Sequence, residues 1–293
     1  MGNYAKYSEL LVVLISKITP RLVWTLRRRS MKSLKLTESL IVVSCDCDTD
    51  EDTAAVLEID TKFSQIGITP EYAVPGEVLV RGSSIYLQLH GRGRKFLNHG
   101  YFDHVTVLSN KPAENTFLYS DLNVFEIEDD MDRGHSAIKD LFGSAPTGWR
   151  TPHFGSFEKR SQLKLIATLG KKFGYTYSSS STGFHSLKHG PIDLSGFTAE
   201  IPVTGHGSAG LGVLDSWSFL RDKADSNSFD SPAFFAELRQ IVNRFRGINF
   251  FLNIYFDPRF VPKTEIFWGE LRRELIGIRS VSFEEVLEKV RKL

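Results

Sequence analysis

Short apolar runs rich in β-branched residues alternate along this chain with segments whose apolar residues recur every three or four positions. Residues 41–45 (IVVSC) predict a buried strand, and Val56, Ile59 and Phe63 then predict a helix that ends near Gly67. Alternating strands and helices favour an α/β fold with a parallel sheet or barrel. Further strands are expected at 71–76, 96–99, 148–150, 175–177 and 248–256, and further helices at 156–170, 231–247 and from 282 onward.

One stretch does not fit this alternation. Residues 110–136 show no clear periodicity, and we expect them to form an irregular excursion on the rim of the barrel. The sequence contains no internal repeat, so a single barrel domain is expected rather than a repeat array.

The composition is that of a globular protein. The chain has 293 residues, of which 41% are hydrophobic and 24% charged, which excludes wholesale disorder and suffices for one large α/β barrel. The formal net charge of +1 argues against a polycation that binds nucleic acid. Two cysteines cannot form a disulfide scaffold, so we expect a reducing, cytoplasmic environment.

The basic residues are concentrated near the N-terminus. Seven of them and no acid lie between Glu9 and Glu38, whereas the remaining chain carries more acidic than basic residues. We expect residues 1–36 to form a basic helical extension and residues 37–293 to form the barrel domain. The apolar run 10–15 is too short to span a membrane, and most of the positive charge follows it, unlike in a secretion signal. The extension can pack on the domain, or lie peripherally on the anionic inner face of a membrane.

Two carboxylates follow the first predicted strand. Asp46 and Asp48 are two residues apart, so an extended backbone points both side chains the same way. Neighbouring carboxylates repel each other and need a cation or a shared proton, so one can bind a metal while the other handles protons. The alternative is a solvated acidic N-terminus of the next helix.

A second group of ligand-type residues is the segment 99–104 (HGYFDH). If a helical turn begins at His99, then Asp103 lies on the same face, and both are competent metal ligands. An irregular loop would instead present His104. The alternative is a surface loop in which the histidines bind backbone groups.

Two later segments also place polar residues at the ends of strands. Arg150 suits a carboxylate partner, Pro152 stiffens the loop, and His153 is a candidate acid or base. The strand 248–256 ends at Asp257. The carboxyl ends of parallel strands are where α/β barrels build active sites.

Taken together, four segments resemble motifs of the polysaccharide deacetylase family, also called the NodB-homology family or carbohydrate esterase family 4. The resemblance extends over residues 44–293, and the motifs stand in the family's order. The matching segments are 44–48 (SCDCD), 71–76 (EYAVPG), 96–101 (FLNHGY) and 148–154 (GWRTPHF).

This resemblance implies a single-domain, distorted (β/α)₇-type barrel and metal-dependent removal of N-acyl groups from amino sugars. It implies that Asp48 and His99 bind a divalent metal, with zinc as the expected ion. It also implies that Asp46 is the catalytic base and that Arg150 orients it.

Two departures from the family pattern leave roles open. The family places its second metal-binding histidine four residues after the first, where this chain has Asp103, so the third ligand is either Asp103 or His104. Asp257 stands where the family has the histidine that protonates the leaving amine, and His153 and His206 are the alternative acids. Candidate substrate contacts are Tyr101, Trp149, Pro152 and Trp217.

The function predicted from the sequence is therefore that of a hydrolase of linear amide C–N bonds. Its expected substrate is an N-acetylated or N-formylated amino sugar in a glycan precursor, including precursors of lipopolysaccharide O-antigen and other surface glycans. Two alternatives remain: a catalytically impaired sugar-binding relative, and a membrane-surface partner protein that uses the basic extension.

Overall fold

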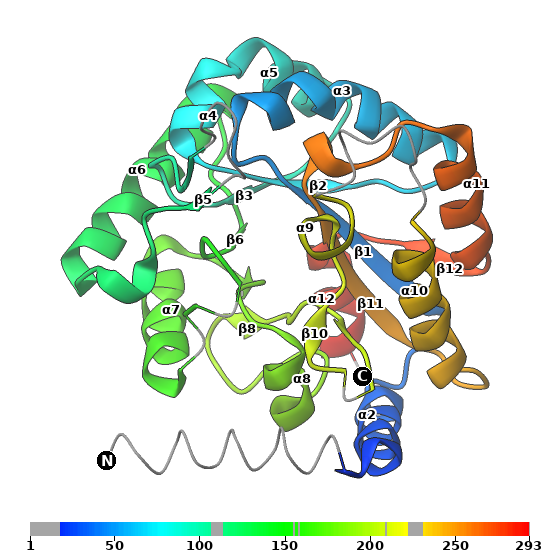
Figure 1. The fold of residues 1–293 in the computed structure, drawn as a ribbon. Coiled ribbons are helices and arrows are strands. Elements are labelled where there is room, and N and C mark those ends of the chain that lie inside the picture. Colours follow the sequence, from blue (N-terminus) through cyan, green and yellow to red (C-terminus); the bar gives the residue numbers. More distant parts are fainter. Residues whose placement is uncertain are drawn as a thin grey trace.

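A curled, mostly parallel sheet forms the centre of the molecule (Figure 1). The computed structural model describes residues 18–106, 114–154, 156–157, 159–208, 210–221 and 231–292. The strand order is β11-β1-β2-β3-β6-β7-β8, and β12 pairs with the first residues of β1. The strands are β1 (Ser39–Asp46), β2 (Glu71–Val74), β3 (Phe96–Asn98), β6 (Gly148–Trp149), β7 (Tyr177–Ser178), β8 (Ala199–Glu200), β11 (Phe251–Phe256) and β12 (Ile278–Ser280).

Helices surround this sheet and confirm the predicted α/β fold, a distorted barrel (Figure 1). Hydrogen bonds connect the two ends of this sheet, strand β11 and the segment after β8. The Asn253 N–H of β11 donates to Thr204 Oγ1, and the Asn253 side chain donates to the Ile201 carbonyl. The helices are α2 (Pro20–Ser33), α3 (Asp50–Gln65), α4 (Gly76–Arg81), α5 (Ser83–Gly91), α6 (Val124–Phe142), α7 (Arg160–Phe173), α8 (Gly183–His189), α9 (Ser216–Phe219), α10 (Pro232–Arg244), α11 (Glu265–Glu274) and α12 (Phe283–Arg291).

Within the described ranges, no helix is long and apolar enough to cross a membrane. The short pairs β4 (Val105–Thr106) with β5 (Glu114–Asn115), and β9 (Gly205–His206) with β10 (Gly212–Val213), lie outside the main sheet.

The expectation of an irregular excursion at 110–136 is wrong for much of that stretch. Residues 107–113 lie outside the described part, but α6 begins at Val124 with a capping box formed by Asn123 and Glu126. Ile127, Met131 and Ile138 form its buried stripe. The stripe is narrow and interrupted by acidic residues, which hides its period in the sequence.

Helix α7 also differs from the prediction that Gly170 ends it. The helix continues to Phe173, and Gly174 with φ +76° ends it in the left-handed conformation that glycine favours. Gly170 has a different reason to be small, because a Cβ there would lie 2.6 Å from Thr198 Oγ1.

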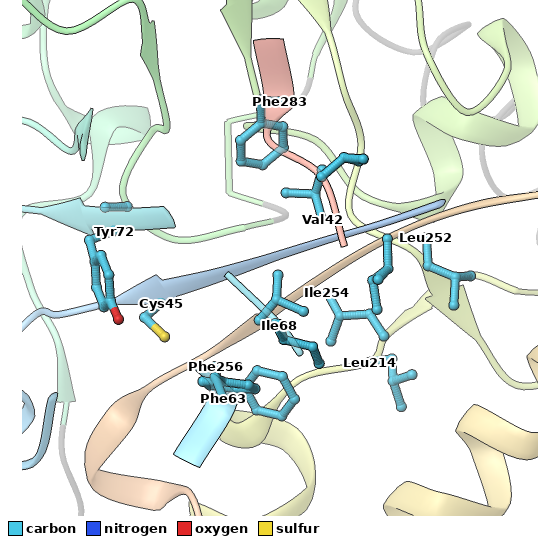
Figure 2. Close-up of a cluster of buried hydrophobic side chains, with 14 of the residues drawn as sticks. Val42, Cys45, Phe63, Ile68, Tyr72, Leu214, Leu252, Ile254, Phe256 and Phe283 are labelled. Atoms are coloured by element: carbon cyan, nitrogen blue, oxygen red, sulfur yellow. The ribbon is translucent and has the colours of Figure 1, made fainter. Parts of the chain in front are cut away.

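The two faces of β1 have different partners, and Figure 2 shows side chains from both. Cys45 lies beside Tyr72, and Phe256 packs on Phe63 with ring centroids 5.4 Å apart. Cys45 and Cys47 are fully buried, as expected for residues that flank Asp46 and point to the opposite face.

Glu71 lies fully buried at the start of β2. Its carboxylate accepts hydrogen bonds from the Phe283 N–H (2.7 Å) and the Tyr177 hydroxyl (3.2 Å). Burial outweighs these bonds and raises the pKa of Glu71 to about 7.

At pH 8, Glu71→Gln should be more stable than wild type. The folded wild type holds the proton of Glu71 more tightly than the unfolded chain does, so loss of that proton at pH 8 destabilises the fold. Its favourable contribution is complete below the unfolded pKa of 4.5 and is lost as the pH rises through about 7. Chemical denaturation should show that the free energy of unfolding of the variant, relative to wild type, is higher at pH 8 than at pH 5 by on the order of 2 kcal/mol. Glu58→Gln, at an exposed position of α3, is the control, and an equal gain there would contradict this account.

Helix α2 packs against the barrel. Trp24 and Met31 are buried in the main core, and Arg27 donates to the carbonyls of Gly183 and Gly210. The division into residues 1–36 and 37–293 stays a prediction, and the apolar run 10–15 lies outside the described residues.

Candidate active site

A cleft opens at the carboxyl ends of the strands. Its volume is about 220 Å³, and it is lined mainly by polar side chains. Strand β1 contributes Asp46 and the loop after it Asp48, while Asp257 follows the end of β11. The lining residues are Asp46, Asp48, His99, His153, Phe154, Val213, Asp215, Trp217, Ser218, Tyr255 and Asp257.

Three buried ligand-type side chains converge at this cleft. Asp48 Oδ1 lies 3.3 Å from His99 Nε2 and 3.1 Å from His104 Nε2. Although burial alone raises the pKa of Asp48, the two imidazoles hold it well below its usual range.

His99 is oriented from its other side. Its Nδ1–H donates to the Arg150 carbonyl (2.9 Å), which directs Nε2 toward Asp48. A carboxylate with two imidazoles is a donor set for a divalent transition metal, and tetrahedral zinc places its ligand atoms roughly 3.3 Å apart. The three residues Asp48, His99 and His104 therefore fit such an ion.

The structure does not bring Asp103 to this cluster. Segment 99–104 is not helical, because Gly100 adopts φ +76° and the chain bends after it. Asp103 is exposed and forms an ion pair with Arg81 at 3.0 Å, whereas His104 is buried against Asp48. The helical turn expected at His99, which would have placed Asp103 beside it, does not form.

Asp130 of α6 holds the backbone of this loop, a role that no sequence pattern indicated. Its Oδ1 accepts the N–H groups of Tyr101 (2.8 Å) and Phe102 (2.9 Å), and its Oδ2 accepts the Tyr119 hydroxyl (2.6 Å). The contribution was hidden because α6 itself was not predicted.

Gly134 lies one turn after Asp130 and lets α6 approach the same loop. A Cβ at this position would overlap Asn98 Oδ1 and the Gly100 carbonyl. Gly134→Ala should therefore destabilise the protein by roughly 1–3 kcal/mol and weaken metal binding, measured by thermal denaturation and metal titration. Gly269→Ala in α11 is the matched control, since nothing lies within 4 Å of its Cβ and alanine favours a helix. Equal stability of the two variants would contradict this close packing.

Arg150 and Asp46 form a buried ion pair beside the cluster. The guanidinium donates through Nη1 to Asp46 Oδ1, and through Nε (3.1 Å) and Nη2 (3.1 Å) to Ser179. Burial nevertheless raises the pKa of Asp46, although Arg150 and His99 oppose it. Arg150 thus positions the carboxylate without holding its pKa low.

Asp257 lines the same cleft and is buried near other carboxylates. Ser216 Oγ donates to its Oδ2 at 2.7 Å. Burial, followed by the charges of Asp52 and Asp48, raises the pKa of Asp257 well above its usual range. The structure therefore favours its protonated form, which is the form a proton donor requires.

The two histidines considered as alternative acids are placed differently. His153 lines the cleft, but its Nε2–H donates to the Thr116 carbonyl (2.8 Å), and burial lowers its pKa to about 4. A neutral imidazole is a poor proton donor. His206 lies 3.3 Å from Glu237 and is not among the residues that line the cleft.

The expected substrate contacts are only partly at the cleft. Trp149 is fully buried and stacks on Tyr175, because it directly precedes Arg150 at the end of β6 and so points to the opposite face. Tyr101 lies under the Arg133 guanidinium, 4.0 Å from its ring centroid, and Pro152 is buried; neither lines the cleft.

Trp217 does line the cleft, as do two aromatic residues that sequence reasoning missed. Tyr255 packs against Phe154 with centroids 4.8 Å apart, and its hydroxyl donates to Asp215 (2.6 Å). Tyr255 lies two residues before Asp257 in the same extended segment, and this spacing is a sequence signal for its orientation.

Comparison with known proteins gives no match by sequence: no family model and no curated protein matches the chain. Its structure is similar to one assigned as a polysaccharide deacetylase from Mycobacterium smegmatis, with 18% identity, 87% of this chain and 91% of the other covered, and a TM-score of 0.63. It is also similar to the allantoinase PuuE (12% identity, 83% and 74% covered, TM-score 0.59).

A third similar structure is a mutant of BA3943, a CE4 family pseudoenzyme with restored enzymatic activity (12% identity, 86% and 69% covered, TM-score 0.52). At these identities the likeness concerns the fold and leaves the activity to be argued from the cleft. The chain thus has the fold of the polysaccharide deacetylases, the NodB-homology fold of carbohydrate esterase family 4.

Proposed function

We propose that this protein is a metal-dependent hydrolase that removes an N-acyl group from an amino sugar. The observation that carries the proposal is that Asp46, Asp48, His99 and Asp257 line one cleft, with His104 and Arg150 buried directly behind Asp48 and Asp46. These groups provide a ligand set, a base and an acid, which amide hydrolysis requires.

Each residue has a separate task in this scheme. Asp48, His99 and His104 would hold a divalent ion, which would supply Lewis acidity toward the amide carbonyl and lower the pKa of water. Asp46 accepts the proton of the attacking water while Arg150 fixes its orientation, and its raised pKa makes it a stronger base than an ordinary aspartate.

Asp257 acts as the general acid, at the position where the polysaccharide deacetylase family has a histidine. Its carboxylic acid donates a proton to the leaving amine nitrogen, so that a neutral amine departs. Ser216 holds the carboxyl group in place from the side of α9.

The walls of the cleft support a carbohydrate as the substrate. Trp217 and Tyr255 offer aromatic surface, and Asp215 and Ser218 offer hydrogen-bonding groups. Such a combination suits a polyhydroxylated ring with one apolar face. We infer that the substrate is an N-acylated amino sugar of a glycan precursor, such as those of surface glycans and lipopolysaccharide, and that zinc is the ion.

The test is hydrolysis of N-acetyl and N-formyl amino sugars, both free and nucleotide-linked, before and after chelation, with zinc, cobalt and manganese added back. Release of acetate or formate that stops with chelation and returns with one of the metals supports the proposal. Activity that survives complete metal removal would overturn it.

The alternative of an impaired sugar-binding relative rests on Asp257 in place of the family's histidine. A protein that binds a metal and a sugar in the cleft but releases no acyl group from any member of the panel would support this alternative.

A second proposal concerns helix α2, which has an exposed apolar stripe beside exposed basic residues. Leu22 and Leu26 are about half-exposed, and Ile18, two residues before α2, is 70% exposed. Arg21 and Arg29 are exposed nearby, as are Lys32 and Lys35. This pattern suits the surface of an anionic membrane, and we propose that α2 binds peripherally to one.

Vesicle flotation tests this contact. Full-length protein should float with phosphatidylglycerol-containing vesicles at low salt and less so at high salt, because salt screens the charges. Leu22→Ser/Leu26→Ser should abolish flotation, whereas Ile266→Ser/Ile276→Ser, at exposed apolar sites elsewhere, should not. Point variants are preferred because removal of α2 would expose the core around Trp24.

A further inference from the structure

A second cluster of metal-ligand side chains lies outside the cleft, on α8 and the turn that follows it. His185 and His189 are four residues apart on α8, and their rings stack with centroids 4.4 Å apart. One nitrogen of each ring and one oxygen of Asp193 all lie within 4.8 Å of one another. None of the three residues lines the cleft.

The chain reverses direction in order to bring Asp193 back to the helix. Gly190 ends α8 with φ +94°, a conformation that residues with a Cβ rarely adopt. The backbone of Asp193 then pairs with that of Glu200 of β8 through two hydrogen bonds of 2.8 and 2.9 Å. This pairing fixes the carboxylate relative to the sheet.

The Asp193 carboxylate is divided between two tasks. Its Oδ1 accepts the N–H of Ser195 at 2.9 Å, which orients the group. Its Oδ2 faces both imidazoles, 3.0 Å from His185 Nε2 and 3.6 Å from His189 Nδ1. These separations lie on either side of the roughly 3.3 Å expected between two ligands of tetrahedral zinc.

We propose that His185, His189 and Asp193 bind a second divalent transition-metal ion, of the zinc class, independently of the cleft. Two imidazoles and a carboxylate are the donors that such ions prefer, and a carboxylate already oriented by a backbone N–H is a supported ligand. His185 is buried while His189 is half-exposed, so the site opens to solvent and an ion can enter without unfolding.

Such an ion would tie the end of α8 to β8. Glu200, the backbone partner of Asp193, accepts the N–H groups of Ser180 and Ser181 (both 2.9 Å). The preceding Ser179 binds the guanidinium of Arg150. The bound ion would therefore stabilise the segment 179–181, which binds Arg150 through Ser179.

Metal stoichiometry tests the proposal. Chelator-stripped full-length protein, titrated with Zn²⁺ and with Co²⁺, should take up two equivalents, measured by calorimetry and by elemental analysis after gel filtration. His189→Ala should take up one equivalent, with affinity at the second site reduced at least about 100-fold, since even loss of a group behind a ligand costs 10–100-fold. His90→Ala, at an exposed histidine of α5, should still take up two.

Asp48→Ala separates this proposal from the proposed function, because it removes a ligand of the cleft only. If His189→Ala takes up one equivalent fewer than wild type, the α8 site is supported whatever Asp48→Ala does. Uptake by His189→Ala that equals wild type in equivalents and affinity would overturn the α8 site, and the cleft would then be judged by Asp48→Ala alone. Equal melting temperatures of wild type, His189→Ala and His90→Ala in chelator would show that the variants are folded.

Discussion

His104→Ala should lose both the metal binding and the deacylase activity that we propose for the cleft. His104 Nε2 lies 3.1 Å from Asp48 Oδ1 in a buried position, so alanine leaves two ligands where three are needed. We expect acyl release to fall by at least about 1000-fold, because the activation of water and the polarisation of the carbonyl are lost together. Acetate release and cobalt absorption spectra measure the two effects.

Asp103→Ala is the matched control, one residue earlier in the same loop. Asp103 is exposed and paired with Arg81, so its loss should change activity less than about threefold, as expected for a surface ion pair. If Asp103→Ala were as inactive as His104→Ala, the loop would have to adopt another conformation when metal binds, and the assignment of His104 would be wrong.

Asp257→Asn should reduce the turnover number by about 100- to 10 000-fold, the usual contribution of a general acid. An amide cannot donate the proton that the leaving amine needs. Metal content should stay at the wild-type value, because Asp257 is not part of the Asp48–His99–His104 cluster. Steady-state kinetics and metal analysis of the same preparation measure both properties.

The pH dependence of the turnover number tests the same role of Asp257. Burial and the neighbouring carboxylates raise the pKa of Asp257, so the acid form is lost, and activity falls, as the pH rises through that raised value. Burial also raises the pKa of Asp46, so activity grows with pH until that base is ionised. Wild type should therefore show a bell-shaped profile, and Asp257→Asn should lose the limb at high pH.

Asp257→His would place the family's residue at this position and should recover part of the activity lost in Asp257→Asn. Wild-type activity in Asp257→Asn, with the high-pH limb intact, would assign the proton donor elsewhere.

The sheet and several cleft residues were predictable because they depend on short-range patterns. The apolar run of β1 and the helical spacing in α3 predicted their elements, and the structure confirms both. The alternation of side chains along a strand correctly placed Cys45 and Cys47 in the core, on the face opposite Asp46. The convergence of strand ends brings Asp46, Asp48 and His99 into one cleft, as the barrel rule predicts.

Other features depended on contacts that no local pattern contains. His104 rather than Asp103 lies at Asp48 because Gly100 bends the loop and Asp130, about thirty residues away, holds its backbone. Trp149 lies in the core and not at the cleft, because it ends β6 one residue before Arg150 and its side chain points to the opposite face.

The sequence by itself determined the α/β barrel, its strand ends and the kinds of groups that gather there, since these follow from the periodicity of side chains and the parallel arrangement of strands. Only the tertiary structure decided which imidazole meets Asp48 and which form of Asp257 is favoured. The first depends on a loop held by a distant helix, and the second on burial beside other carboxylates, so both arise only when segments far apart in the chain are packed together.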